Sequence, residues 1–226
     1  RIDFYNEVDW ESTNALLKAE FPLSVSNSEA TYDLGIGSVK RSNNTLTAYE
    51  VYAQYWADLT DKCGNYGVSV MNDGKYGWDK PNDNTIRLTL LHTPETKGGY
   101  AYQNRQDFGY HTFTYSLVPH AGALDKPATV LKAKQLNQPI LAFKADKHAG
   151  TLGKSFTFVH SDNNSVVVKT LKKAEVSDEY VVRVYETSGE KAQQAEIVFA
   201  GDILSASEAD GTEKTIGQAA FSGNKL

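Results

Sequence analysis

Residues 67–79, GVSVMNDGKYGWD, read as a strand that runs into a turn rich in polar and aromatic side chains. An Asp-Gly pair is enough to reverse a chain, so the turn itself does not require the lysine, tyrosine and tryptophan that follow. Aromatic rings stack on the apolar faces of sugars, while carboxylates, amides and ammonium groups bind sugar hydroxyls. The candidate contacts to a carbohydrate or to another domain are Asn72, Asp73, Lys75 and Tyr76.

A purely structural role would produce the same residues in this turn. An Asn-Asp-Gly turn can be stabilised by a lysine–carboxylate pair, with the Tyr-Gly-Trp segment packed into the core. Residue chemistry alone leaves both interpretations open.

A second group of polar residues lies in DFGYHTFTYSLVPH, residues 107–120, which contains Asp107, His111 and His120. These side chains could hold a metal ion or bind a sugar. A strand-end histidine whose ring is satisfied by a backbone carbonyl is the simpler explanation, and we favour it. Asp107 and His111 remain candidate binding or interface residues.

The sequence shows neither a complete catalytic set nor a metal-ligand motif. The five histidines form no close ligand pair, no Gly-x-Ser-x-Gly elbow is present, and no helix pattern follows GIGSV to bind a phosphate. Cys63 is the only cysteine, which excludes an internal disulfide and a cysteine-based zinc site. We predict no catalytic residue, no metal site and no cofactor in this chain.

The segments that position these residues alternate in the manner of half-buried strands. In ATYDLGIGSV the alternation would place Tyr32, Leu34 and Ile36 on one face. TIRLTLLHT and HTFTYSLV, residues 85–93 and 111–118, alternate apolar and polar residues in the same way. The sequence therefore predicts a β-rich chain.

The last third of the chain suggests two hairpins. SFTFVH and SVVVKTL flank the turn at 162–164, and YVVRVYE and AEIVFAG flank the turn at 187–190. Only NALLKAE and ATVLKAKQLN have a helical appearance, and the first leads into Phe-Pro, which suits a strand at least as well. Residues 121–139 contain two prolines and little alternation, so we expect a connection between two halves there.

Composition and charge narrow the function classes. The 226 residues include no apolar run near the roughly 20 residues that span a bilayer. A net charge of -5, with lysines interspersed among acids, argues against a nucleic-acid surface. We expect a soluble protein with no nucleic-acid or membrane partner, and the cytoplasm is the favoured location. The chain opens Arg-Ile-Asp-Phe without an initiator methionine, so we expect it to be a piece of a longer polypeptide.

Several segments, taken in order and at their spacings, resemble the β-sandwich region of glycoside hydrolase family 38, the α-mannosidases. The resemblance is strongest to the branch that contains cytosolic, vacuolar and bacterial enzymes. The matching segments are RIDFYNEVDWES, LLKAEFPL, YDLGIGSVKR, WADLTD, YGVSVMNDGKYGWD, IRLTLLHTP, DFGYHTFTYSLVPHAG, LNQPIL and LKKAEVSDEYVVRVYETSGE. Gly74 stands where family members more often carry cysteine or serine, and His92 where arginine is commoner. Neither change removes a group that hydrolysis requires.

The resemblance implies an all-β fold over residues 1–226, an antiparallel supersandwich like that of galactose mutarotase with little helix. It also implies a parent α-mannosidase whose N-terminal catalytic barrel carries the aspartate nucleophile and a divalent, zinc-like cation, followed by a helical bundle. The barrel and bundle of the same polypeptide and mannose-containing glycans would then be the partners of this chain. The chain alone is expected to be inactive.

Two other function classes remain open. A free-standing carbohydrate-binding module would explain the aromatic loops and would bind sugar as the isolated chain. A purely structural or assembly domain would bind no sugar and would associate with the barrel or with itself.

Overall fold

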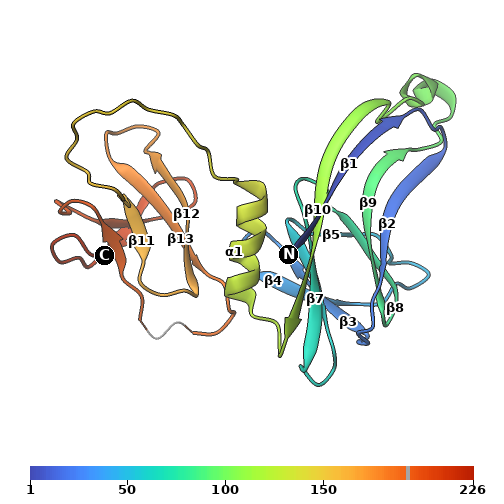
Figure 1. Ribbon diagram of the computed structural model, residues 1–226, viewed down its shortest axis with the longest axis horizontal. Helices are drawn as coiled ribbons and strands as arrows, with labels where there is room; N and C mark the ends of the chain where they lie inside the picture. The colour runs from blue at the N-terminus through green and yellow to red at the C-terminus, as the bar shows by residue number, and fades with distance from the viewer. Residues whose placement is uncertain (192–193) are drawn as a thin grey trace. The chain divides into compact units, whose positions relative to one another are not determined.

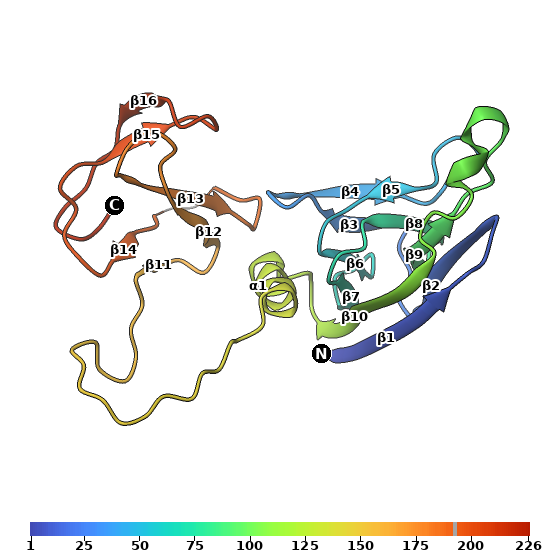
Figure 2. The ribbon, with the colours of Figure 1, turned by 90° about the horizontal axis from the view of Figure 1, so that it is seen from above.

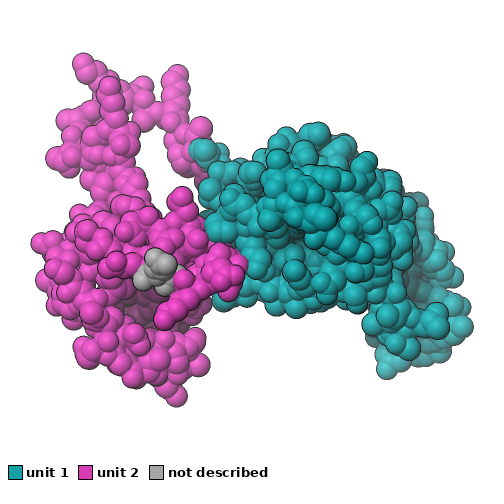
Figure 3. All heavy atoms as spheres, turned by 90° about the horizontal axis from the view of Figure 1, so that it is seen from below, with its two compact units in different colours: residues 1–140 teal, residues 141–226 magenta. Residues whose placement is uncertain are grey.

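The computed structural model describes residues 1–191 and 194–226, which form two compact units (Figures 1 and 3). Unit 1 comprises residues 1–140 and unit 2 residues 141–226. Among the described residues every strand pair is antiparallel, and the helices are limited to η1 (Gly98–Gln103) and α1 (Lys126–Asn137). Neither helix is long and apolar enough to cross a membrane. The predicted all-β, antiparallel fold with little helix is confirmed.

The larger sheet of unit 1 has six strands. In spatial order they are β1 (Ile2–Trp10), β10 (Gly109–Ala121), β7 (Tyr66–Asn72), β6 (Trp56–Thr60), β3 (Glu29–Asp33) and β4 (Ser38–Ser42). β10 is long enough to pair with β1 over residues 109–117 and with β7 over residues 115–121. The end of β7 therefore lies beside the middle of β10.

The smaller sheet of unit 1 has four strands. In spatial order they are β2 (Ala15–Pro22), β9 (Thr85–Thr93), β8 (Gly77–Asn82) and β5 (Val51–Tyr52). The predicted alternation in β9 is confirmed, because Ile86 and Leu88 are fully buried while Arg87 and Thr89 are half-buried. NALLKAE, the segment with an ambiguous helical appearance, lies largely in β2.

The two sheets of unit 1 pack face to face around one hydrophobic core (Figure 2). Leu59 and Val70 contribute from the larger sheet, and Trp78, Ile86 and Leu88 from the smaller one. All five side chains are fully buried, and each such burial is worth about 1.5–3 kcal/mol. The core thus fixes which faces of β7 and β8 point inward.

Helix α1 covers the opposite face of the larger sheet. Ala133 packs with Trp56, Met71 and Val118 in a second, smaller apolar cluster. The helix begins where the Asp125 side chain accepts a hydrogen bond from the Ala128 amide at 3.0 Å, with proline in the first turn. Residues 121–139, expected as a connection, therefore contain the end of β10 and a capped helix.

A buried carboxylate links the smaller sheet to the segment between β4 and β5. Asp79 accepts hydrogen bonds from the Arg87 guanidinium, from Lys18 Nζ at 2.8 Å and from Asn44 Nδ2 at 2.8 Å. These hydrogen bonds hold the pKa of Asp79 below its ordinary value, although burial alone would raise it. The charge is buried but fully paired.

The next residue along β8 buries a positive charge. Lys80 is 1% exposed, and its ammonium donates to the backbone oxygens of Asn27 and Asn82 at 2.6 Å each and to Asn43 Oδ1 at 2.7 Å. Each of the three N–H donors of the Lys80 ammonium group therefore has an oxygen acceptor.

The described residues of unit 2 form three two-stranded sheets. They are β11 (Val159–Ser161) with β14 (Ile197–Phe199), β12 (Val166–Lys173) with β13 (Tyr180–Glu186), and β15 (Ser207–Ala209) with β16 (Thr215–Gln218). The two hairpins expected here are wrong in their pairing, because β12 pairs with β13 and β11 with the distant β14. Alternation identifies strands but does not specify a partner far along the chain.

One predicted strand of unit 1 is shorter than expected. β3 ends at Asp33, and residues 34–37 turn the chain into β4 through a hydrogen bond from the Leu34 amide to the Gly37 oxygen at 3.1 Å. Leu34 and Ile36 are exposed, so they do not share a buried face with Tyr32. Gly35 and Gly37, with φ of 82° and 80°, supply the left-handed backbone that this turn needs.

Candidate functional site

The turn with the candidate residues connects the two sheets of unit 1, because β7 belongs to the larger sheet and β8 to the smaller one. Asn72, the last residue of β7, is fully buried and organises this turn. Its Oδ1 accepts from the amides of Gly74 and Lys75 at 2.9 and 2.7 Å, and its Nδ2 donates to the Gln54 oxygen at 2.9 Å. This geometry gives Asn72 a positioning role.

Asp73 is exposed and ties the turn to β10. Its backbone amide donates to the Thr114 oxygen at 3.2 Å, and its Oδ2 accepts from the Thr114 amide at 2.8 Å. One carboxylate oxygen is thus engaged in a structural bond at the surface.

Lys75 lies half-buried between the turn and β10. Its Nζ is 4.7 Å from the centre of the Phe113 ring, a cation–π arrangement. Burial lowers the pKa of Lys75, and the negative charges of Asp107 and Asp73 partly oppose that shift. An ammonium group thus lies in the field of two carboxylates, one from each group of candidate residues.

Tyr76 completes the turn on its exposed side. The Tyr76 ring is 47% exposed and lies 6.5 Å from the ring of Tyr52, between centroids. Aromatic surface and charged groups are therefore next to each other in sequence and accessible to a partner.

Asp107 and His111 meet at the start of β10. His111 Nε2 is 2.7 Å from the Asp107 backbone oxygen, and Asp107 Oδ2 accepts from the His92 amide at 2.9 Å. The expectation of a histidine satisfied by a backbone carbonyl is thereby confirmed. Asp107 has a φ of 59°, a left-handed conformation that is uncommon for a residue other than glycine.

His120, the third polar residue of the same segment, lies at the other end of β10. Its Nε2 is 2.9 Å from Oδ2 of the buried Asp58, which also accepts from Ser69 and Thr60 hydroxyls at 2.7 and 2.6 Å. The hydrogen bond to Asp58 raises the pKa of His120. His120 therefore belongs to a separate structural network.

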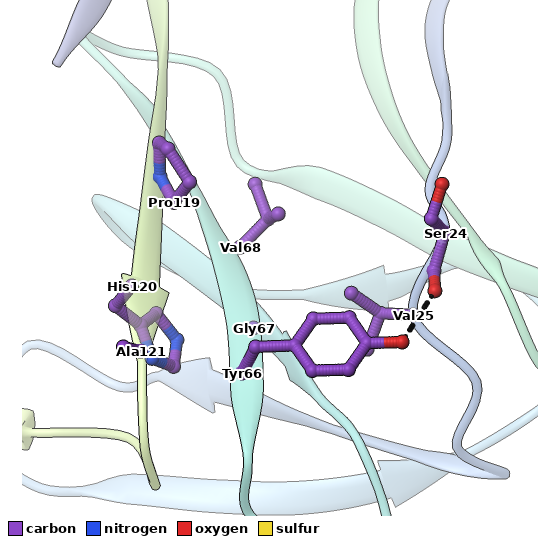
Figure 4. Close-up of a pocket in the computed structure, with 8 residues that line it drawn as sticks. All are labelled: Ser24, Val25, Tyr66, Gly67, Val68, Pro119, His120 and Ala121. Atoms are coloured by element: carbon purple, nitrogen blue, oxygen red, sulfur yellow. Dashed lines mark hydrogen bonds between the residues drawn. The ribbon is translucent and has the colours of Figure 1, made fainter.

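An open depression lies beside this network (Figure 4). Its volume is about 460 Å³, and its walls include Ser24, Tyr66 and Pro119. The Tyr66 hydroxyl already donates to the Ser24 oxygen at 2.8 Å, and both ring nitrogens of His120 lie near protein oxygens. These polar groups of the depression are hydrogen-bonded to other atoms of the protein, so we place the candidate site at the 72–76 turn.

A metal ion does not fit the candidate residues. Within the described residues there is no group of three histidine, cysteine, aspartate or glutamate side chains that could hold one. The Asp107 carboxylate is directed to the His92 amide and His111 to a backbone oxygen, so these two side chains do not converge as ligands. The site can supply a cation, carboxylates and aromatic faces, which suits a polar, uncharged ligand or a docking domain.

The sequence did not reveal which core residue supports this site. Phe113 was identifiable as an inward-facing residue of a strand, but its contact with Lys75 depends on the pairing of β10 with β7. The register that brings Thr114 next to Asp73 is equally non-local.

Comparison with known proteins supports the resemblance seen in the sequence. Residues 1–97 match the glycosyl hydrolases family 38 C-terminal domain, and residues 165–225 match the glycosyl hydrolases family 38 C-terminal beta sandwich domain. Alpha-mannosidase 2C1 of Homo sapiens is 34% identical over 196 residues, which cover 83% of this chain and 18% of that protein. The alpha-mannosidase of Saccharomyces cerevisiae is 31% identical over 209 residues, covering 84% of this chain and 18% of that protein.

Solved structures share the fold. The crystal structure of an alpha-mannosidase from Enterococcus faecalis V583 has a TM-score of 0.75 at 21% identity, covering 87% of this chain and 23% of that one. The β-sandwich and the sequence matches define the class of this chain as a C-terminal β-sandwich domain of a glycoside hydrolase family. The chain belongs to glycoside hydrolase family 38, to the C-terminal region of its α-mannosidases, and it spans about a fifth of the length of the curated relatives it matches.

Proposed function

We propose that this chain is the C-terminal β-sandwich portion of a retaining α-mannosidase that hydrolyses terminal α-mannosides. The 72–76 turn, together with Asp107 and His111, would form a wall of the active site or would support the active site without lining it. The observation that carries this proposal is the position of Lys75 in the turn between β7 and β8, at an edge of the sandwich, where it is half-buried against the Phe113 ring at 4.7 Å and follows the exposed Asp73. Ligand sites favour domain interfaces, and such an edge suits one.

The chemistry explains why other parts of the polypeptide are needed. A retaining glycosidase uses one carboxylate as nucleophile and one carboxyl group as acid and base, about 5–5.5 Å apart. Asp73 and Asp107 each have a carboxylate oxygen bonded to a backbone amide. We assign the nucleophile, the acid and the divalent cation to the N-terminal barrel of the parent enzyme, and we expect no hydrolysis of an aryl α-mannoside by this chain alone.

The test uses the full-length parent enzyme and the variants Asp73→Asn, Asp73→Ala and Lys75→Met. Asparagine keeps an oxygen for the Thr114 amide and removes the charge, while alanine removes both. We expect kcat/KM for an aryl α-mannoside to fall about tenfold or more in all three, because misplacement of a positioned group disturbs the reacting geometry. The expected loss of stability is about 1 kcal/mol or less for Asp73→Ala.

Glu29→Ala is the matched control, since Glu29 is an exposed acid on β3 of the same unit. It should leave both kinetics and stability unchanged. If kcat/KM is unchanged in Asp73→Asn and Lys75→Met, the turn has only a structural role. Unfolding of the enzyme by Asp73→Ala would lead to the same conclusion for that residue.

A further inference from the structure

The connection between the consecutive strands β9 and β10, which lie in different sheets, is unusually long. Residues 94–108, here called the tyrosine loop, comprise fifteen positions in the sequence PETKGGYAYQNRQDF. Most connections of compact domains are about 4–6 residues, and longer ones are commonly functional. In Figure 1 the loop, with η1, stands in green beyond the ends of β9 and β10.

The base of the tyrosine loop is fixed to the core of unit 1. Thr93 is fully buried; its Oγ accepts from Trp10 Nε1 at 2.8 Å and donates to the Gln106 backbone oxygen at 2.5 Å. On the other side of the base, the Asp107 carboxylate accepts from the His92 amide. The two ends of the loop are therefore held together by side-chain bonds.

The body of the loop is also ordered, by successive tight turns. Backbone amides of residues 100, 104, 106 and 108 each donate to the oxygen three positions earlier, at 3.2–3.3 Å. A compact surface loop with closed ends of this kind is an Ω-loop, and such loops frequently carry function.

The outer surface of the loop offers two aromatic rings. Tyr100 is 66% exposed and Tyr102 is 76% exposed, and no residue of η1 is buried. Gln103 Nε2 donates to the Tyr102 hydroxyl at 3.0 Å, and Gln106 Nε2 donates to Gln103 Oε1 at 3.1 Å. The Tyr102 hydroxyl hydrogen and the Gln106 side-chain oxygen have no partner among the described residues, so both can bond to a ligand.

We propose that the tyrosine loop binds the sugar residues of an oligosaccharide that lie beyond the mannose being cleaved. This inference rests on the proposed function, because Asp107 at the base of the loop is itself a candidate residue and its backbone oxygen lies 2.7 Å from Nε2 of the candidate residue His111. Tyrosine rings stack on sugar faces, and the chain of two amides ending at a tyrosine hydroxyl supplies donors and acceptors for hydroxyl groups.

The composition of the loop favours a glycan over a protein surface. Between residues 94 and 108 there is no leucine, isoleucine, valine or methionine, so the large apolar side chains of the loop are all aromatic, the kind that stack on sugar rings. Lys97 and Arg105 balance Glu95 and Asp107, so the loop as a whole has no net charge. A neutral, hydroxyl-rich ligand fits such a surface.

The experiment compares two substrates of the full-length enzyme, an aryl α-mannoside and a mannotriose. For Tyr100→Ala/Tyr102→Ala we expect kcat/KM for the mannotriose to fall about tenfold, or about 1.4 kcal/mol, while the aryl value changes less than about twofold. Tyr102→Phe keeps the ring and should keep most of the mannotriose activity. Gln106→Ala should cause an intermediate loss. The control is Tyr49→Ala, which removes an equally exposed tyrosine (62%) before β5.

An unchanged mannotriose value, or an equal fall with both substrates, would overturn the assignment of the tyrosine loop. The outcome is separate from that of the Asp73 and Lys75 variants, which are judged on the aryl substrate alone. The proposed active-site wall can therefore fail while the ratio of the two substrates still reports on the loop.

Discussion

Both units are built from antiparallel strands, but they use them differently. In unit 1, ten strands form two sheets that face each other, and all but one of the buried apolar side chains of the described residues lie there. In unit 2, six strands form three separate pairs, and Ile197 is its single buried apolar side chain among those residues. A two-stranded pair is marginal in water, so strand formation alone does not make a stable body.

The charges follow the same division. Unit 1 buries Asp79, Lys80 and Asp58 with complete sets of partners. Unit 2 holds the accessible pair of Lys173 with Asp178, whose side chains are 64% and 96% exposed. Removing one partner of a buried ion pair strongly destabilises a fold, whereas an exposed ion pair contributes little to the free energy of unfolding.

The largest expected effect concerns the autonomy of the units. We expect a fragment of residues 1–140 to unfold in urea in one cooperative transition, with a slope of about 1–3 kcal/mol/M, because it contains its own core. A fragment of residues 141–226 should show no cooperative transition. The measurement is far-UV circular dichroism against urea, with the 226-residue chain as reference. A cooperative urea transition in the fragment of residues 141–226 would contradict the expected difference between the two units.

The next effect concerns a fully buried carboxylate and a partly exposed one. Asp79→Ala should destabilise the chain by about 3–5 kcal/mol, because it leaves Arg87 and Lys18 without their buried partner. Glu213→Ala removes one of the two acidic partners of Lys172 in unit 2 and should cost clearly less, because Lys172 keeps its pairing with Glu175. Equal losses for the two variants in urea unfolding would contradict the comparison.

A smaller effect is expected at two strand glycines. A Cβ on Gly67 would lie 2.6 Å from His120 Nε2 and 2.8 Å from the Thr60 hydroxyl, so Gly67→Ala should cost about 1–3 kcal/mol. A Cβ on Gly217 in unit 2 would meet Glu208 at an ordinary 3.6 Å, and Gly217→Ala should stay within about 0.5 kcal/mol. Thermal unfolding of both variants gives the comparison; a neutral Gly67→Ala would show that the side chains yield easily.

The smallest effect is a pH dependence in unit 1. Asp58 raises the pKa of His120 above its ordinary 6.5, so the paired imidazolium stabilises the fold fully below that value. The stabilisation is lost as pH rises through the folded pKa. The free energy of unfolding should therefore fall more steeply in the wild type than in His120→Gln as pH rises above 6.5. Identical slopes would show that the histidine is not charged in the folded chain.

The sequence predicted strands and turns correctly where residues close together in the chain determine them. The alternation of residues 85–93 and 111–118 gave β9 and β10 correctly, because one face of each strand contacts the core. The turn at 72–77 was recognised from its Asn-Asp-Gly residues. Leu34 and Ile36 were misassigned because two glycines turn the chain before the alternation ends.

Pairing and site geometry depended on contacts far apart in sequence. β12 and β13 are joined by residues 174–179, which contain no glycine, asparagine or proline to signal a hairpin. The contact of the Lys75 ammonium with the Phe113 ring requires the register of β10 against β7, which no local pattern encodes. The candidate residues could thus be named from the sequence, but their arrangement could not.

Lys80 gives unit 1 a built-in chemical reporter. Its ammonium is surrounded by three oxygens and 1% exposed, so an amine-acylating reagent can reach it only when unit 1 opens. Lys173 of unit 2, 64% exposed, should be acylated at once. The acylation rate of Lys80 relative to that of Lys173 would therefore measure how often the sandwich opens under native conditions.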